Sequence, residues 1–239
     1  MGEYVISTCM CAVYHLLLGY SCWRETEYYL VVDGGEDPSL IHQLIRYTSY
    51  FLFVFNMSLN LTDDPKRLRS VLSLMTAVIL TPLSFYEISK FILQNGIFFH
   101  DNFQLRMLEC YMSYCIADTI VARIYYPQYF GVLDGWFHHL STFLFILYYY
   151  DKKSAIVPCI GFMTETSSVI LCASRVFYGN TQLKWLKTNI FPTIFLLFRV
   201  VFLGLVICLF ENLQSSGMFI WYCLFVGVNL SWFKKFIKK

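Results

Sequence analysis

Residues 134–150 read DGWFHHLSTFLFILYYY, and this stretch decides the fold class. After its first residue it has no Asp, Glu, Lys or Arg and is rich in apolar and aromatic side chains, which is typical of a helix that crosses a membrane. It also carries two adjacent histidines, His138 and His139, near its start. Ionisable groups at membrane depth are rare and usually face a bundle interior, a cavity or a reaction site. The stretch therefore predicts a spanning helix with a functional site on it.

The composition of the whole chain supports a membrane protein. Its 239 residues are 57% hydrophobic and 14% charged, with a mean hydropathy of +0.54. Soluble domains carry about 25% charged residues, and a soluble globule of this size could not cover so much apolar surface. The net charge of +2 gives no basic field for nucleic acid. The nine cysteines show no metal-ligand spacing, so we expect neither a metal site nor a disulfide framework.

The lengths of the apolar stretches predict the number of spans, because a spanning helix needs roughly 20 mostly apolar residues. Eight stretches approach that length: 4–20, 44–61, 71–93, 106–123, 134–150, 154–177, 188–210 and 217–233. We therefore expect an all-α bundle of about eight transmembrane helices that encloses an internal cavity. The organisation predicted along the chain is a first helix and non-cytosolic loop, a transmembrane domain and a basic tail, at 1–42, 43–235 and 236–239.

The basic residues in the short loops predict the orientation, since cytosolic loops are enriched in Lys and Arg. An even number of crossings puts both termini on one side. That side collects ten basic residues: Lys66, Arg67, Arg69, Arg123, Lys184, Lys187, Lys234, Lys235, Lys238 and Lys239. The other side has five: Arg24, Arg46, Arg106, Lys152 and Lys153. Both termini are therefore predicted to be cytosolic.

Two opposite charges lie near the middle of consecutive spans. Arg199 follows an apolar run in the seventh stretch, and Glu165 lies in the sixth. A guanidinium does not give up its proton, so it needs a partner inside a membrane, and Glu165 has the matching depth. We therefore expect the two side chains to face each other. Ser168 lies three residues after Glu165 and shares its helix face.

Two further polar residues lie on the cytosolic side with the histidine pair. Thr142 follows His138 by four residues and shares its helix face, and Asp118 lies in the fourth stretch. Adjacent helical side chains point about 100° apart, so we expect one imidazole to face a ligand while the other orients it. We also expect a histidine to line a cavity open to the cytosol, with Asp118 or Glu165 in its wall. The alternative is a buried polar cluster that holds the helices in register.

Several known chemistries are excluded by the motifs. One histidine pair is too few for the histidine boxes of a di-iron membrane desaturase. The chain has no HExxH helix, no GxSxG nucleophile elbow and no phosphate-binding loop. If the chain is an enzyme, a histidine would act as general base or as transient acyl carrier.

The segment Tyr129–Thr142 resembles the TLC domain, together with Glu165–Ser168 one helix later and the Phe-Leu-Leu-Phe-Arg run that ends at Arg199. The resemblance covers about Gln43–Lys235. TLC domains occur in ceramide synthases, in translocon-associated membrane proteins and in other proteins of lipid handling. Ceramide synthases carry a His-Asp-x-x-Asp pattern in the next helix, where this chain has the single acid Glu165. The chain is therefore more similar to the branch outside the ceramide synthases.

The resemblance implies a function and a site. In ceramide synthases the matched histidine pair is required for acyl transfer, a role that would fall on His138 and His139. Glu165 or Asp118 would orient the imidazole. The residues expected to bind the substrate are Thr142, Ser168 and Arg199. Acyl-CoA is the expected co-substrate, no cofactor or metal is expected, and the family resemblance implies the endoplasmic reticulum.

A different class of function uses the same residues without catalysis. A lipid-binding protein, a protein that sets membrane composition or a cargo receptor would use the cavity and the polar cluster to recognise a head group. A channel or transporter is less favoured, because the chain shows no repeated halves. If replacement of each histidine by alanine abolishes a lipid change on expression while the protein level holds, the enzyme is favoured over the binding protein.

Overall fold

The computed structural model describes residues 39–60, 62–94, 102–151, 155–205 and 216–237. The chain divides into two compact units, Met1–His42 and Gln43–Lys239, and the fold described below is that of the second unit. The predicted first span at 4–20 lies outside the described residues. All regular secondary structure in the described ranges is helical, as the sequence predicted.

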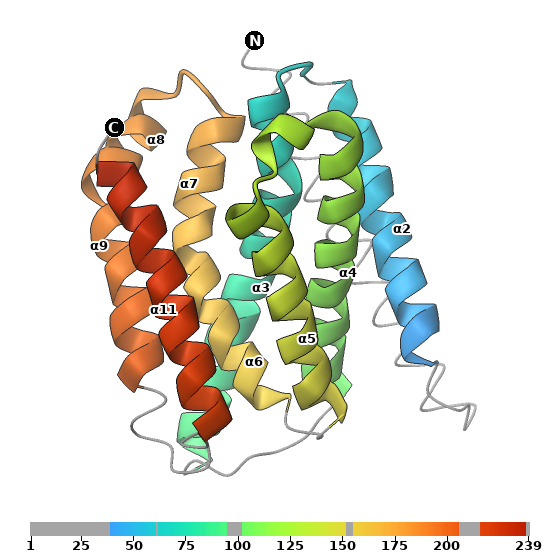
Figure 1. Ribbon diagram of the computed structural model, residues 1–239, viewed down its shortest axis with the longest axis vertical. Helices are drawn as coiled ribbons and strands as arrows, with labels where there is room; N and C mark the ends of the chain where they lie inside the picture. Colours follow the sequence, from blue (N-terminus) through green and yellow to red (C-terminus); the bar gives the residue numbers. More distant parts are fainter. Residues whose placement is uncertain (1–38, 61, 95–101, 152–154, 206–215, 238–239) are drawn as a thin grey trace. The chain divides into compact units, whose positions relative to one another are not determined.

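Long helices form most of the second unit. They are α2 (Leu40–Leu59), α3 (Pro65–Leu93), α4 (Asn102–Tyr125), α5 (His138–Asp151) and α11 (Ser216–Ile237). Two more are composite. The first joins α6 (Ile156–Gly161), the 3-10 turn η3 (Phe162–Glu165) and α7 (Thr166–Val176), and the second joins α9 (Phe191–Leu196) and the π-helical turn η4 (Leu197–Phe202). The helices α3, α4, α5, α6–α7, α9–η4 and α11 alternate in direction (Figure 1).

Short elements connect these helices at the end of the bundle where α3 begins and α4 ends. The 3-10 turn η1 (Pro127–Tyr129) and the π-helical turn η2 (Val132–Phe137) lead from α4 into α5, and α8 (Thr181–Asn189) leads from α7 towards α9. α3 itself has a strong start, because Asp64 accepts the backbone N–H of Lys66 at 2.9 Å and Pro65 occupies the first helical position.

Two described helices are long and apolar enough to cross a membrane. They are Pro65–Leu93 and Ile156–Val176, and the pair Thr181–Asn189 and Phe191–Leu205, bent by 50°, would add a third. α4 has the length, at 24 residues, but its ionisable side chains make it too polar by composition: Arg106, Glu109, Asp118 and Arg123. The structure therefore confirms an all-helical chain with two or three candidate spans. The count of about eight spans stays a prediction.

The packing of the bundle places small and apolar side chains between neighbouring helices. α3 packs most extensively against α7, and it buries Leu72, Ala77 and Leu80 completely. α4 likewise buries Leu108 and Met112. Close contact of this kind, rather than the exclusion of water, holds helices together in a bilayer.

Apolar side chains are exposed on the outside of the bundle, and several polar side chains are buried among the apolar ones inside. Large apolar side chains are exposed on several helices, among them Phe85, Leu93, Leu144, Val201 and Leu224. Buried polar and charged side chains lie inside, and they include Gln43, Glu87, Gln104, Glu109, Asp118, His139, Arg199 and Asn229. Lipid cannot hydrogen-bond to polar groups, so a membrane bundle keeps them in its interior. The candidate site is part of this interior.

Candidate functional site

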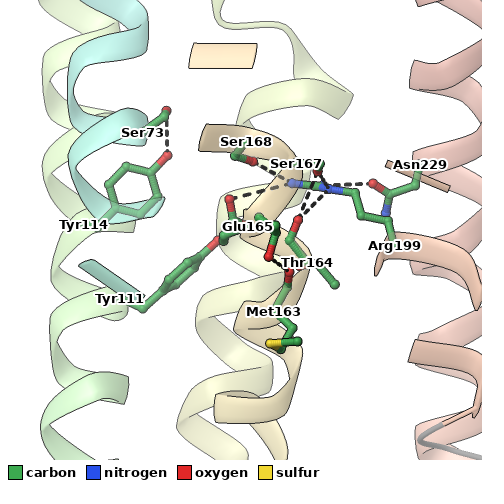
Figure 2. A network of polar contacts seen from close by, with 11 residues as sticks. Ser73, Tyr111, Tyr114, Met163, Thr164, Glu165, Ser167, Ser168, Arg199 and Asn229 are labelled. Atoms are coloured by element: carbon green, nitrogen blue, oxygen red, sulfur yellow. Dashed lines mark hydrogen bonds and ion pairs between the residues drawn. The ribbon is translucent and has the colours of Figure 1, made fainter. Parts of the chain in front are cut away.

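Arg199 lies at the centre of a network of polar contacts in the interior (Figure 2). Its Nε donates to the Thr164 carbonyl at 3.2 Å and to Ser167 Oγ at 2.9 Å. Its Nη1 donates to Asn229 Oδ1 at 2.9 Å, and its Nη2 donates to Ser168 Oγ at 2.8 Å. One guanidinium therefore ties α7, η4 and α11 together. The rigid fork of donors on Arg is suited to such a junction.

Glu165 supplies the negative charge of this network. Its Oε2 lies 3.7 Å from Arg199 Nη2, and its Oε1 accepts a hydrogen bond from the Tyr111 hydroxyl of α4 at 3.2 Å. The prediction that Glu165 and Arg199 face each other is confirmed. Tyr111 extends the network to a fourth helix, so the cluster joins α4, α7, η4 and α11.

Irregular helical turns position these groups. Glu165 ends the 3-10 turn η3, and Arg199 lies within the π-helical turn η4. The Thr164 carbonyl of η3 accepts hydrogen bonds from both Arg199 Nε and Ser167 Oγ. Departures from the α-helical hydrogen-bond pattern free carbonyls in this way, and π-helical turns are frequent at functional sites. Arg199 also lies 5.4 Å from the centroid of the Phe195 ring, a cation–π contact.

His139 belongs to a second network, with Asp118 and Tyr126. Its Nε2 lies 3.4 Å from Asp118 Oδ2, and its Nδ1 lies 3.3 Å from the Cys115 carbonyl oxygen. The Tyr126 hydroxyl donates to Asp118 Oδ1 at 2.7 Å. Both partners of the imidazole are acceptors, and an imidazolium donates to both whereas a neutral ring donates to only one. His139 and Asp118 thus lie within ion-pair distance of each other, both buried, between α4 and α5.

His138 has different surroundings. Its ring makes edge contacts with His139, at 5.6 Å between centroids, and with Trp232 of α11, at 5.3 Å. The ring nitrogens make no hydrogen bond or ion pair with any residue in the described ranges, and the hydrogen bond of Ser141 Oγ goes to the His138 backbone carbonyl. The Trp232 ring also lies 5.8 Å from the guanidinium carbon of Arg199, so it contacts both His138 and the Arg199 network. The two imidazoles therefore differ. That of His139 has polar partners, whereas that of His138, the open imidazole, has none among the described residues.

The open imidazole lines a pocket of about 30 Å³. His138, Thr142, Glu165 and Tyr111 contribute polar atoms or rings to it, and the remaining wall is mostly apolar: Phe145, Ile146, Pro158, Gly161, Phe162, Thr164, Leu203 and Phe225. Such a volume holds one or two water molecules. Asp118 and His139 are not among the lining residues. The pocket joins three of the predicted site residues, and a cavity large enough for an acyl chain stays a prediction.

The turn before His138 depends on a glycine. The π-helical turn η2 begins after Gly131, whose carbonyl accepts the N–H groups of Gly135 at 2.9 Å and Trp136 at 3.3 Å. A Cβ atom at Gly135 would lie 2.8 Å from the ring of Phe130. Phe130 in turn makes an edge contact with the His139 ring at 5.5 Å. Gly135 therefore allows the close approach that packs Phe130 against His139.

A further set of buried contacts lies towards the start of α4. Arg106 Nη1 donates to both carboxylate oxygens of Glu109, at 3.0 and 2.8 Å, and the Tyr150 hydroxyl donates to the same carboxylate at 2.9 Å. Gln104 Nε2 donates to Glu87 Oε2 at 2.7 Å. These contacts join α4 to α5 and to α3, none of their residues lines the pocket, and we regard them as structural.

Sequence reasoning missed several members of the site. Asn229 is completely buried in α11 and bonds to Arg199, and the sequence signal was a lone amide in an apolar span. Tyr111 and Tyr126 had no distinguishing signal among 18 tyrosines. Trp232 contacts both His138 and Arg199, but aromatic residues are common at many depths of a membrane protein.

Comparison with known proteins finds no family model, no curated protein and no solved structure that matches this chain. The resemblance to the TLC domain therefore rests on the motif residues themselves.

Proposed function

We propose that this chain is a multi-pass membrane protein of TLC type that transfers an acyl group from acyl-CoA to a lipid acceptor, with His138 as the catalytic base. The proposal includes about eight spans, cytosolic termini and a location in the endoplasmic reticulum. It combines the sequence motif with the geometry of the pocket.

The distribution of basic residues supports the orientation. Lys66, Arg67 and Arg69 lie in the first turns of α3, and Arg123 lies in the last turn of α4. α8 carries two lysines, and Lys234 lies near the end of α11. These element ends lie together at one end of the bundle (Figure 1). Under the positive-inside rule this end faces the cytosol. α5 begins at the same end, so its histidines lie on the side from which acyl-CoA would approach.

The observation that carries the proposal is the open imidazole of His138 beside the Glu165 carboxylate and the Thr142 hydroxyl in one pocket. The imidazole of His138, which makes no hydrogen bond to a described residue, is available to take a proton, whereas that of His139 is held by Asp118 and the Cys115 carbonyl. General-base catalysis of this kind contributes typically 10²–10⁴-fold to a rate.

The proposed reaction follows from these positions. The acceptor hydroxyl or amine gives its proton to His138 and attacks the thioester carbonyl, which forms the new ester or amide bond. The carbon–sulfur bond then breaks, and the proton passes from His138 to the departing thiolate of coenzyme A. Thr142 lies on the pocket wall and binds the acceptor. Ser168 accepts a hydrogen bond from Arg199, and Arg199 in turn holds Glu165 in the pocket wall.

A second candidate function is lipid binding without catalysis. Two observations favour it: the pocket of about 30 Å³ is far smaller than an acyl chain, and the Arg199 network is satisfied by the protein itself. In this case the polar cluster holds the helices in register, and the protein sets membrane composition by binding lipid at its surface.

Acyl transfer in isolated membranes distinguishes the two functions. Membranes that contain the wild-type chain are incubated with labelled acyl-CoA, and the label in each lipid class is measured. His138→Ala is expected to lower incorporation by at least 100-fold at equal protein level. His42→Ala, which replaces an exposed histidine of α2, is the matched control and is expected to retain activity. Equal incorporation by His138→Ala and wild type would exclude His138 as the base.

A further inference from the structure

The pocket beside His138 reaches the surface of the bundle. Several of its lining residues are partly exposed: His138, Thr142, Phe145, Gly161, Glu165 and Phe225. They belong to α5, to α6 with η3, and to α11, and Figure 1 shows α6 between α11 and α5. From His138 to Phe145 the lining covers about 10 Å of rise along α5. The opening is therefore a slot in the side of the bundle, which runs along α5 from its start.

Gly161 lines the deeper part of this slot. It is the last residue of α6, and a Cβ atom on it would meet nothing within 4 Å among the residues that the structure describes. Glycine in a helix costs about 1 kcal/mol relative to alanine, so this position gives up helix stability. What the glycine leaves in return is open space at a partly exposed point of the pocket wall.

The upper part of the slot carries two polar side chains that are free to bind a ligand. The ring nitrogens of His138 and the hydroxyl of Thr142 make no hydrogen bond with any residue in the described ranges, and both side chains line the pocket. They lie four residues apart on one face of α5. A neutral imidazole accepts a hydrogen bond through one nitrogen, and a threonine hydroxyl can donate one. A ligand hydroxyl can donate to the first and accept from the second.

The charge of the pocket wall favours an uncharged ligand. Glu165 is the only acidic side chain among the lining residues, and no Lys or Arg lines the pocket. Its carboxylate lies 3.7 Å from Arg199 Nη2 and accepts a hydrogen bond from Tyr111 (Figure 2). A phosphate would meet the carboxylate, and an ammonium would enter beside a carboxylate that is already balanced. Burial of either charge without a counter-ion is unfavourable.

The size of the pocket restricts the ligand further. A volume of about 30 Å³ holds one or two groups of the size of a water molecule. A hydroxyl head fits such a space, whereas a phosphocholine head and a hydrocarbon chain do not. The chain of a bound lipid would therefore stay outside the pocket, in the bilayer beside α5 and α11.

We propose that the slot admits the uncharged hydroxyl head of a membrane lipid sideways from the bilayer, and that Gly161 keeps this entrance open. The inference rests on the proposed function for its membrane orientation and acyl transfer, and it names the acceptor as a neutral lipid alcohol. The hydroxyl oxygen forms the new bond to the acyl carbon, and its proton passes to His138. The carbon–sulfur bond breaks, coenzyme A leaves with that proton on its sulfur, and the product is an ester.

Thermal unfolding of the full-length protein in detergent tests the entrance, since a ligand of the native state raises the midpoint. The probes share one chain and differ in the head: dodecanol, dodecyl methyl ether, dodecylamine and dodecyl phosphate. The variants are Gly161→Leu, which fills the entrance, and Thr142→Val, which removes the hydroxyl. The matched control is Gly227→Leu, which adds the same side chain at an exposed glycine of α11 that meets nothing within 4 Å and does not line the pocket.

We expect dodecanol to raise the midpoint of the wild type and of Gly227→Leu, and the other three probes to protect the wild type less. The apparent affinity for dodecanol is expected to be at least tenfold weaker for Gly161→Leu and to be weakened for Thr142→Val. Without ligand, Gly161→Leu is expected to unfold at the wild-type temperature or above it, because the new side chain enters open space and glycine is lost from a helix.

Four results would overturn the proposal. Wild-type affinity of Gly161→Leu for dodecanol would exclude the entrance, and so would an equal loss in Gly227→Leu. A lower midpoint of Gly161→Leu without ligand would show that the space beside the glycine is not open. Protection by the ether, the amine or the phosphate equal to that by dodecanol, or no protection by dodecanol, would exclude a neutral alcohol.

The outcome is separate from that of the acyl-transfer assay, because no acyl-CoA is present in the binding experiment. Loss of dodecanol binding in Gly161→Leu supports the entrance even if the wild type transfers no acyl group. Conversely, acyl transfer by Gly161→Leu at the wild-type rate would exclude the entrance and leave the proposed function standing.

Discussion

The carboxylate of Glu165 and the guanidinium of Arg199 lie 3.7 Å apart in the interior of the bundle, on consecutive long helices. Neither charge is tolerated alone at that depth, so their pairing is a condition for the two helices to enter a membrane together. Asn229 and two serines complete the coordination of the guanidinium.

Replacement of Arg199 is expected to destabilise the bundle severely. Arg199→Gln leaves Glu165 buried without its counter-charge, and removal of one partner of a buried pair costs about 3–5 kcal/mol. Arg199→Lys keeps the charge but offers no planar fork to the acceptors on three elements, so we expect an intermediate loss. Thermal unfolding in detergent measures both effects. A midpoint for Arg199→Gln equal to that of the wild type would contradict the assigned role.

The hydroxyl of Tyr126 is expected to contribute to the free energy of unfolding, whereas the hydroxyl of Tyr125 is not. Tyr126→Phe removes the 2.7 Å hydrogen bond to the Asp118 carboxylate, and hydrogen bonds to charged groups contribute about 1.5–3 kcal/mol. Tyr125→Phe is the matched control, because Tyr125 is exposed and its ring contact with Phe55 survives the change. Denaturation of the two variants side by side gives the comparison. Equal stability would show that the His139–Asp118 pair does not depend on Tyr126.

Replacement of Gly204 by alanine is expected to destabilise the bundle, whereas replacement of Gly227 by alanine is not. A Cβ atom at Gly204 would lie 2.5 Å from the hydroxyl of Tyr222, which donates to the Val200 carbonyl at 3.0 Å. Gly204→Ala is therefore expected to displace Tyr222 and lower the unfolding midpoint. Gly227→Ala meets nothing within 4 Å and is expected to leave stability unchanged or raise it.

A rescue experiment sharpens the test of this contact. The double variant Gly204→Ala with Tyr222→Phe removes the clashing hydroxyl and is expected to regain part of the lost stability. Failure of the second change to recover any stability would place the effect of Gly204→Ala elsewhere.

The orientation can be tested with single cysteines at opposite ends of the bundle. Tyr178 follows α7 at the proposed cytosolic end, and Leu93 ends α3 at the other; both are exposed. A membrane-impermeant maleimide applied from the cytosolic side is expected to label Tyr178→Cys and not Leu93→Cys, above the background of the native cysteines. Labelling of Leu93→Cys alone would reverse the orientation.

The sequence predicted the helical class and the Glu165–Arg199 pair because both follow from local rules. Apolar length predicts helices, and two isolated opposite charges at equal depth have few other partners. It could not assign separate surroundings to His138 and His139. That difference depends on which neighbour meets each ring, Trp232 of α11 for the first and Asp118 of α4 for the second.

The rest of the site depends on departures from regular helix geometry. The 3-10 turn at Glu165 and the π-helical turns before His138 and around Arg199 leave no periodicity in the sequence that a helical pattern would reveal. Their carbonyls and the aromatic ring packed on Gly135 are products of tertiary contact. The count of eight spans stays a prediction, because it rests on apolar length and includes a segment outside the described residues.

Comparative lipidomics tests most directly whether His138 performs acyl transfer. Cells that lack the protein are supplied with the wild-type chain, with His138→Ala or with His42→Ala at matched protein levels. The proposed function predicts that wild type and His42→Ala restore the same acyl-lipid species and that His138→Ala does not. Full restoration by His138→Ala would contradict it and leave lipid binding without catalysis as the function.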